Sequence, residues 1–371
     1  MRRFTTTSPS ARKSAGRILY AAVILLTLNS CGALDDDLLR GSSIRFGVKH
    51  SSSTLGTKAA YGSGSTFSAD ADRNVLWEND DLLRIACNEC IDTKNAVYKA
   101  VSATSGGQAG LQVDTSSDNL RWGTGTHNIY AVYPSTSTIA ESTGTLTATV
   151  AAFQTGTATS SSDDWTVAPA MDNLVLVSKI SSAPTDDALN FPFTALSTAI
   201  KMQITNNRGA AMRVASIALQ STASQNLSGS FTADMSSWTQ NVTSGSYTYP
   251  TCTAAGSNTQ AVTITTTYGT NDYLEIADQG TLTATFFLLP TAALYDLKFV
   301  ITFSDASTLS TVIKRTDGGD DTANRITFPA HKKSYVTGIL VPKGIDWTSV
   351  YVHGTEDYTV EDSQTGETYW K

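Results

Sequence analysis

The stretch SIRFGVKH, residues 43–50, has the alternating pattern of a half-buried β-strand. Its apolar and polar side chains fall on opposite faces, with Ile44, Phe46 and Val48 on one and Ser43, Arg45 and Lys49 on the other. Successive side chains of a strand point to opposite faces of the sheet, so this period of two predicts one buried and one solvated face. The stretch therefore predicts a strand that covers a hydrophobic core.

Similar strand patterns recur along the rest of the chain, separated by Gly, Ser, Asn and Asp. Examples are HNIYAVYP at 127–134, NLVLVSKI at 173–180, TAIKMQITN at 198–206 and SYVTGILVP at 334–342. Many short strands at such spacing favour β-sandwiches over a parallel sheet. We therefore expect an all-β protein with two sandwich domains.

The expected organisation follows from a linker and from the amino terminus. The polar stretch SSAPTDDALN, residues 181–190, is the best linker candidate. The predicted units are a signal peptide, a lipidated propeptide, an N-terminal β-sandwich domain and a C-terminal one, at residues 1–30, 31–58, 59–185 and 186–371.

The amino terminus has the features of a lipoprotein signal. A basic head precedes an apolar run over 18–28, which is too short for the about 20 residues that a membrane-spanning helix needs. The run ends in Leu28-Asn29-Ser30-Cys31, which resembles a bacterial lipobox, so we expect cleavage between Ser30 and Cys31 and lipidation of Cys31. Asp35, Asp36 and Asp37 resemble the surface-export signal of Bacteroidetes lipoproteins, and the alternative is a solvated tether.

Composition excludes several classes of protein. The net charge is −7 and charged residues make up 16% of the chain, which fits neither a polyanion binder nor a disordered acidic tail. We expect no nucleic-acid partner. Three cysteines remain besides Cys31, an odd number, so a complete disulfide framework is not available.

Several motifs resemble the fimbrillin (FimA/Mfa-type) family of Bacteroidetes fimbrial subunits. The stretch WGTGTHNIYAVYPS at 122–135 is similar to the family pattern W-x-x-x-x-x-H-x-F-x-A-Y-Y-P. ITFPAHKKSYVTGILVP at 326–342 is similar to I-x-F-P-A-G-K-K-Y-x-(I/V)-T-G. TKAAYGSG at 57–64, VLWENDDLLRI at 75–85 and FPFTALSTAIKMQITN at 191–206 match further segments in the family order. The resemblance implies two transthyretin-like β-sandwich domains.

The resemblance also implies a mechanism of assembly. The precursor of such a subunit is exported as a lipoprotein, and a protease then cuts after a basic residue that follows the first strand, called A1. Strand A1 leaves with the lipid, and a C-terminal strand of the next subunit fills the exposed groove. This is β-augmentation, in which main-chain hydrogen bonds hold the incoming strand and alternate side chains fill pockets.

On this chain, the A1 candidate is residues 43–50, with Ile44, Phe46 and Val48 as the plug. The matching cleavage site is Lys58-Ala59, where the family has Arg, and this departure puts an Arg-specific protease in doubt. A Lys-tolerant enzyme is one alternative. A subunit that is never cut and anchors the fibre is another.

The donor-strand candidate lies within the tail, residues 345–371. IDWTSVYVHG at 345–354 alternates, and DYTVED at 357–362 is a second candidate strand. The residues assigned to the donor are Trp347, Val350, Tyr351 and Val352. Completion of the second domain's own sheet is an equal alternative.

Catalytic and metal motifs are weak in this sequence. Cys87 and Cys90 have C-x-x-C spacing, but no βαβ pattern surrounds them, and a four-cysteine zinc site would need another pair. A local bridge or free thiols are favoured, and His127 is expected to be structural. We predict no catalytic residue, no metal and no cofactor.

The resemblance predicts a structural subunit of a cell-surface fimbria (a type V pilus) that supports adhesion and biofilm formation. The expected partners are other fimbrial subunits, the outer membrane through the lipid anchor, and surface ligands of host or bacterial cells. The expected location is the outer membrane and then the fimbrium. The alternatives are a surface glycan-binding lipoprotein and an uncleaved anchor or tip subunit.

Overall fold

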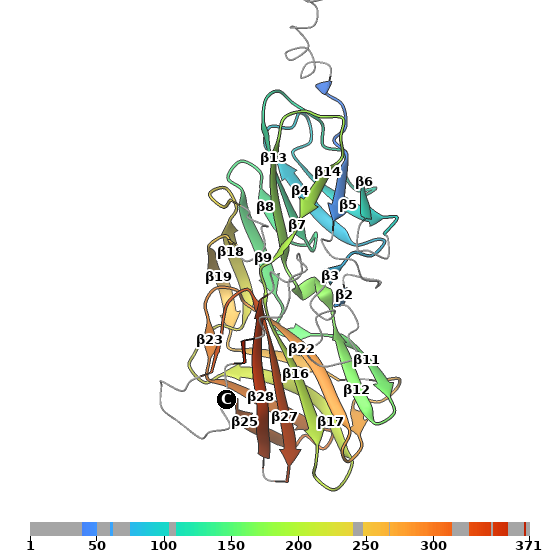
Figure 1. The fold of residues 1–371 in the computed structure, drawn as a ribbon, viewed down its shortest axis with the longest axis vertical. Coiled ribbons are helices and arrows are strands. Elements are labelled where there is room, and N and C mark those ends of the chain that lie inside the picture. Colours follow the sequence, from blue (N-terminus) through green and yellow to red (C-terminus); the bar gives the residue numbers. More distant parts are fainter. Residues whose placement is uncertain are drawn as a thin grey trace, which may run out of the picture.

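The computed structural model describes residues 39–49, 60–61, 75–103, 109–239, 248–266, 268–313, 326–342, 344–354 and 367–368. Strands dominate these residues, and the predicted all-β sandwich class is confirmed (Figure 1). The 3₁₀ helix η2, Met171–Asn173, is a short exception. Within the same residues, no helix has the length and apolar character needed to cross a membrane.

One hydrophobic core lies between an eight-stranded and a four-stranded sheet. In spatial order, the larger sheet contains β14 (Leu189–Pro192), β1 (Phe46–Lys49), β6 (Ala109–Val113), β5 (Asn95–Val101), β4 (Leu82–Cys87), β7 (His127–Tyr133), β13 (Leu176–Ser182) and β15 (Thr194–Ala195). The smaller sheet contains β19 (Cys252–Thr259), β18 (Ser228–Asp234), β9 (Thr145–Val150) and β8 (Thr138–Ala140). Alternation explains why β9 forms, because its second, fourth and sixth residues are buried.

A second core lies between a six-stranded and a seven-stranded sheet. The six-stranded sheet contains β10 (Phe153–Gln154), β20 (Ala261–Thr265), β17 (Met212–Ser221), β24 (Leu297–Phe303) and β25 (Thr308–Val312), with β21 (Leu274–Ile276) paired to β17. The seven-stranded sheet contains β11 (Gly156–Ser161), β12 (Asp164–Pro169), β22 (Thr281–Leu288), β16 (Thr198–Asn206), β27 (Lys332–Val341), β28 (Gly344–Gly354) and β29 (Glu367–Thr368). Two short pairs complete the strands: β2 (Ala60–Tyr61) with β3 (Val75–Leu76), and β23 (Leu294–Tyr295) with β26 (Thr327–Phe328).

Strands from the two halves of the chain interleave in these cores. β12, from before residue 185, pairs in parallel with β22 of the second core. β18, from after residue 185, pairs with β9, and its Phe231 is buried in the first core. Figure 1 shows β18 and β19 beside β8 and β9, and β11 and β12 beside β22. The cores therefore do not divide the chain at one position, and the tandem domain limits stay predictions.

The eight-stranded sheet curls strongly. Its two ends in spatial order are β14 and β15, which are separated by only Phe193 in the sequence. Consecutive residues thus supply both edges, and β1 lies one place in from the β14 edge. β1 is thus an internal strand, with the backbone of β14 on one side and that of β6 on the other. This position defines the candidate site.

Candidate functional site: the slot of strand β1

Strand β1, which covers residues 46–49 of the predicted strand A1 (43–50), lies between two strands that come from later in the chain. It runs parallel to β14, with Phe46 opposite Leu189 and Val48 opposite Phe191. It runs antiparallel to β6, where Phe46 lies opposite Leu111. β1 is the blue strand beside β14 in Figure 1. We call the space between β6 and β14 that β1 fills the β1 slot.

The three side chains of the predicted plug all face the first core. Ile44, Phe46 and Val48 are 3%, 4% and 1% exposed, whereas the intervening Arg45 is exposed. The Phe46 ring packs edge-on to Tyr98, with ring centroids 5.2 Å apart, and stacks on Phe191 at 5.4 Å. Alternate residues, Ile44 just before β1 and Phe46 and Val48 on it, thus fill pockets in the core, as the sequence pattern predicts.

Tyr98, on β5, links the Phe46 pocket to Leu120, which lies along the residues just before β1. Its hydroxyl accepts a hydrogen bond from the Leu120 N–H at 2.9 Å. Burial raises the pKa of Tyr98 to about 12, because the phenolate loses solvation in the core. The neutral phenol is therefore the form that the slot holds at physiological pH.

Gly47 lets β1 pass close to its neighbours. A Cβ atom at Gly47 would lie 2.7 Å from Asn190 Oδ1 and 3.4 Å from the Ala109 carbonyl oxygen. A larger residue would require the Asn190 side chain on β14 to move. The glycine therefore contributes to the close fit of β1.

The segment 120–122 lies along residues 41–44, just before β1, and we call it the 120–122 wall of the β1 slot. The Ile44 N–H donates to the Leu120 carbonyl oxygen at 2.9 Å, and Trp122 N–H donates to the Ser42 oxygen at 3.0 Å. On its other side, the segment accepts a hydrogen bond from the Ile91 N–H through the Arg121 oxygen at 3.2 Å. The segment thus connects the approach to β1 with the turn that contains Cys90.

The tail strand is already paired within its own chain. β28 runs antiparallel to β27, from Gly344 opposite Val341 to Gly354 opposite Lys332, with a register shift between Thr337 and Gly338. Residues 345–354 thus belong to the seven-stranded sheet of the same chain, which is the alternative to a donor strand. Use of these residues as a donor strand stays a prediction, because it involves a second copy.

Several predicted sites lie outside the described residues. They are the lipidation and signal-cleavage site (Ser30 and Cys31), the acidic residues Asp35, Asp36 and Asp37, the cleavage site (Lys58 and Ala59) and the second donor candidate at 357–362. For Trp347, Val350, Tyr351 and Val352, only the backbone in β28 is described. The roles of all these residues stay predictions.

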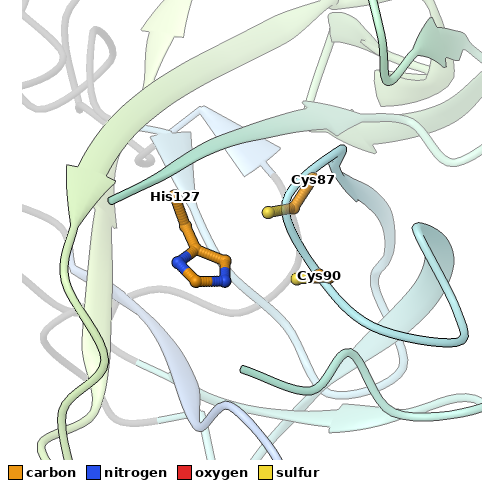
Figure 2. A group of neighbouring side chains, drawn as sticks. All are labelled: Cys87, Cys90 and His127. Atoms are coloured by element: carbon orange, nitrogen blue, oxygen red, sulfur yellow. The ribbon is translucent and has the colours of Figure 1, made fainter. Parts of the chain in front are cut away.

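A separate cluster of Cys87, Cys90 and His127 lies on the far side of the 120–122 wall. Its ligand atoms, two Sγ atoms and one imidazole nitrogen, all lie within 4.8 Å of one another (Figure 2). All three residues are buried, and the two thiols are not joined as a disulfide. A hydrogen bond to Cys87 and then burial raise the pKa of the Cys90 thiol. In the part of the chain that is described, this is the group with the composition of a soft-metal site.

Sequence spacing did not reveal this cluster. Cys87 ends β4 and His127 begins β7, and these strands pair with Cys87 opposite Ile129. The expectation that His127 is structural is supported in one respect, because both of its ring nitrogens bond to the backbone of residues 123–125. No local sequence signal could have found the cluster, because it depends on the pairing of LLRIAC with HNIYAVY.

Comparison with known proteins gives similarity at the level of solved structures. A scan against protein-family models found no match, and no curated protein sequence matches. A candidate cell adhesion protein from Bacteroides uniformis is 14% identical, with 86% of this chain and 98% of that one covered and a TM-score of 0.47. One from Bacteroides ovatus is 13% identical, with 87% and 99% covered and a TM-score of 0.48.

The tip fimbrial protein Mfa3 from Porphyromonas gingivalis, truncated at its C-terminus, is a third similar structure. It is 8% identical, with 84% of this chain and 99% of that chain covered and a TM-score of 0.32. The solved structures that this chain is similar to are thus described as candidate cell adhesion proteins and as fimbrial proteins of Bacteroides and related genera.

Proposed function

We propose that this chain is a structural subunit of a cell-surface fimbria that assembles by exchange of strand β1. The observation that carries the proposal is the placement of β1: the first strand of the described chain fills an internal slot, and Phe46 and Val48 on it and Ile44 just before it are buried in the first core. The motifs that resemble fimbrillins, in the family order, support the same role. Cys31 would anchor the precursor by its lipid until cleavage after Lys58 releases the subunit.

Removal of β1 would leave a site suited to another strand. Backbone groups of β6 and β14 that now bond to β1 would lose their partners, and the pocket between Tyr98 and Phe191 would open. Unpaired strand edges are templates for pairing with another chain. Three buried apolar side chains at about 1.5–3 kcal/mol each give about 5–9 kcal/mol of gross stabilisation to whichever strand occupies the slot.

The incoming strand would come from the tail of a second copy. The strand at 345–354 pairs with β27 in the single chain, so its donation would require that pairing to be released. The stretch 357–362 follows it and alternates as well, with Tyr358 and Val360 on one side. We therefore assign donation to the tail, residues 345–371, as a whole.

The test is cleavage of the soluble chain that begins after Cys31. A protease that cuts after lysine should cut after Lys58, because the stretch 51–57 is rich in Ser and Thr and a polar segment of this kind is readily nicked. Amino-terminal sequencing should then give Ala59. The cut protein should form ladders that resist heating in detergent, as judged by gel electrophoresis and light scattering.

Matched variants separate strand exchange from nonspecific aggregation. Lys58→Ala should stay uncut there and monomeric, while Lys94→Ala, which changes an exposed lysine between β4 and β5, should assemble like the wild type. Deletion of residues 355–371 should shorten or abolish the ladders without unfolding either core. If protein cut at Lys58 remains monomeric at high concentration, the strand-exchange proposal is wrong, and an anchor, a tip or a glycan-binding role takes its place.

A further inference from the structure

The Cys87, Cys90 and His127 side chains converge from two neighbouring segments on a buried point. Cys87 ends β4, Cys90 lies in the turn that follows, and His127 begins β7 (Figure 2). The two sulfurs and the imidazole nitrogen lie within 4.8 Å of one another. A tetrahedral zinc ion, with Zn–S of about 2.3 Å and Zn–N of about 2.0–2.1 Å, places such ligand atoms about 3.5–3.8 Å apart. Inward shifts of about 1 Å or less would therefore complete three sides of the tetrahedron.

The backbone fixes the tautomer of His127. The Gly123 N–H can only donate, and it donates to Nε2 at 2.9 Å, so Nε2 carries the lone pair. Nδ1 therefore carries the proton and donates it to the Gly125 carbonyl oxygen at 2.9 Å. A histidine that ligates a metal commonly has this arrangement, with its second N–H bonded to a carbonyl oxygen. The Trp122 ring, edge-on at 4.8 Å, packs against the imidazole.

A fourth ligand candidate, Glu89, lies beside the cluster but outside the group of three whose ligand atoms are within 4.8 Å of one another, so its side chain would have to turn inward to reach the metal. Glu89 Oε2 accepts a hydrogen bond from the Cys87 thiol at 3.5 Å and from the Asn128 N–H at 3.2 Å. Glu89 is half-buried, so a residual negative charge on the completed site would lie on the side nearest to solvent. Two thiolates select zinc over magnesium or calcium, which prefer sets of oxygen ligands.

We propose that Cys87, Cys90 and His127 bind one zinc ion, with the Glu89 carboxylate as fourth ligand. On binding, the thiols of Cys87 and Cys90 each release a proton to solvent, and two S–Zn bonds form. His127 Nε2 gives up the hydrogen bond from the Gly123 N–H, and its lone pair forms the N–Zn bond. No electron is transferred, so the step needs no oxidant or reductant.

The position of the site gives the metal a structural role. It would join the end of β4, the following turn and the start of β7, in addition to the pairing of β4 with β7 and the hydrogen bond from the Asn128 N–H to Glu89. The turn continues into Ile91, which bonds to Arg121, and the neighbours of Arg121 hold residues 41–44. The metal would therefore brace the 120–122 wall of the β1 slot. This role rests on the proposed function, whereas binding of the metal does not.

The test uses the reduced, metal-free soluble chain that begins after Cys31, titrated with Co²⁺ and then Zn²⁺. Co²⁺ should give thiolate-to-cobalt charge transfer and the d–d bands of a tetrahedral site, with a stoichiometry of about one, and Zn²⁺ should displace it. Cys90→Ser and His127→Ala should abolish the spectrum. Glu89→Gln should keep the charge-transfer band and change the d–d bands. Cys252→Ser is the matched control and should bind like the wild type, because Cys252 lies on β19 in the other sheet.

A readout on the wild-type chain guards against variants that fail to fold. Added zinc should raise its melting temperature, and a chelator should reverse the rise while the far-ultraviolet circular dichroism stays native-like. A wild-type chain with titratable thiols that binds no Co²⁺ would overturn the proposal. Mass spectrometry of the chain as purified, before reduction, would also overturn the proposal if it showed a mass lower by two hydrogens and a peptide that links Cys87 to Cys90. That result would identify a disulfide instead. Ladder formation is measured separately, so failure of assembly and failure of metal binding are distinguishable.

Discussion

Tyr98 combines burial with a single hydrogen bond to the wall of the β1 slot. Its ring is in edge-on contact with Phe46, and its hydroxyl accepts the Leu120 N–H. The same segment that holds the approach to β1 is thus held by a side chain at the base of the pocket.

His331 is a second residue with a local role. Its φ is 63°, in the left-handed region, where the fimbrillin pattern has Gly, and its ring stacks on Tyr249 at 4.3 Å.

The raised pKa of Tyr98 predicts a loss of stability in alkali. Below about pH 10 the phenol is neutral in both states, and its contribution is complete. Above that pH the unfolded chain loses the proton first, because the folded pKa is about 12. Stability from this group should fall by about 1.4 kcal/mol by about pH 11.

The measurement compares wild type with Tyr98→Phe by denaturant unfolding at about pH 8 and about pH 11. The variant should be less stable by about 1–3 kcal/mol at the lower pH, because the buried Leu120 N–H loses its acceptor. The difference between the two proteins should shrink at the higher pH. An equal difference at both values would show that Tyr98 does not titrate differently in the two states.

At the scale of the element, β1 is held by its inward face and by its backbone. Leu189 N–H donates to the Arg45 carbonyl oxygen at 2.9 Å, an interaction that does not depend on the Arg45 side chain. The side chain of Arg45 is exposed, and that of the next residue, Phe46, is buried between two aromatic rings. Arg45, just before β1, and Phe46, its first residue, should therefore respond very differently to truncation.

Phe46→Ala should lower the free energy of unfolding by about 3–5 kcal/mol, the usual range for a buried Phe. Arg45→Ala should change it by no more than about 0.5 kcal/mol. Denaturant unfolding of the uncut chain gives both values. Similar losses for the two variants would contradict the assignment of the inner and outer faces of β1.

At the scale of the whole molecule, the two cores share strands in both directions. β18 brings Phe231 into the first core, and β12 brings Val167 into the second. In the sequence, β12 lies between β9 and β13 of the first core, and β18 lies between β17 and β20 of the second. The chain therefore passes repeatedly from one core to the other. We therefore expect the cores to unfold as one cooperative unit.

Phe231→Ala tests this cooperativity. The loss of about 3–5 kcal/mol from the first core should also lower the protection of β22 amide hydrogens in the second core, measured by native-state hydrogen exchange. The control is Phe153→Ala, since Phe153 is 76% exposed and should change protection by no more than about 0.5 kcal/mol. If only amides of the first core respond to Phe231→Ala, the two cores are independent domains.

The sequence by itself determined the strand class and the inward face of β1. Alternation is a local property, so residues 43–50 alone indicate that Ile44, Phe46 and Val48 face a core, and the structure confirms their burial. TAIKMQITN likewise forms β16, with alternating burial over its second half. The motifs that resemble fimbrillins also come from the sequence, because each is a short contiguous pattern.

The tertiary structure decided which strands are neighbours. The pairing of β18 with β9 joins residues about 80 positions apart, and nothing local in either strand specifies the other. The same reason explains the cluster of Cys87, Cys90 and His127, which depends on the pairing of β4 with β7. Hydrophobic burial is nondirectional and sets only which faces are covered, whereas partner choice depends on how all the strands pack at once.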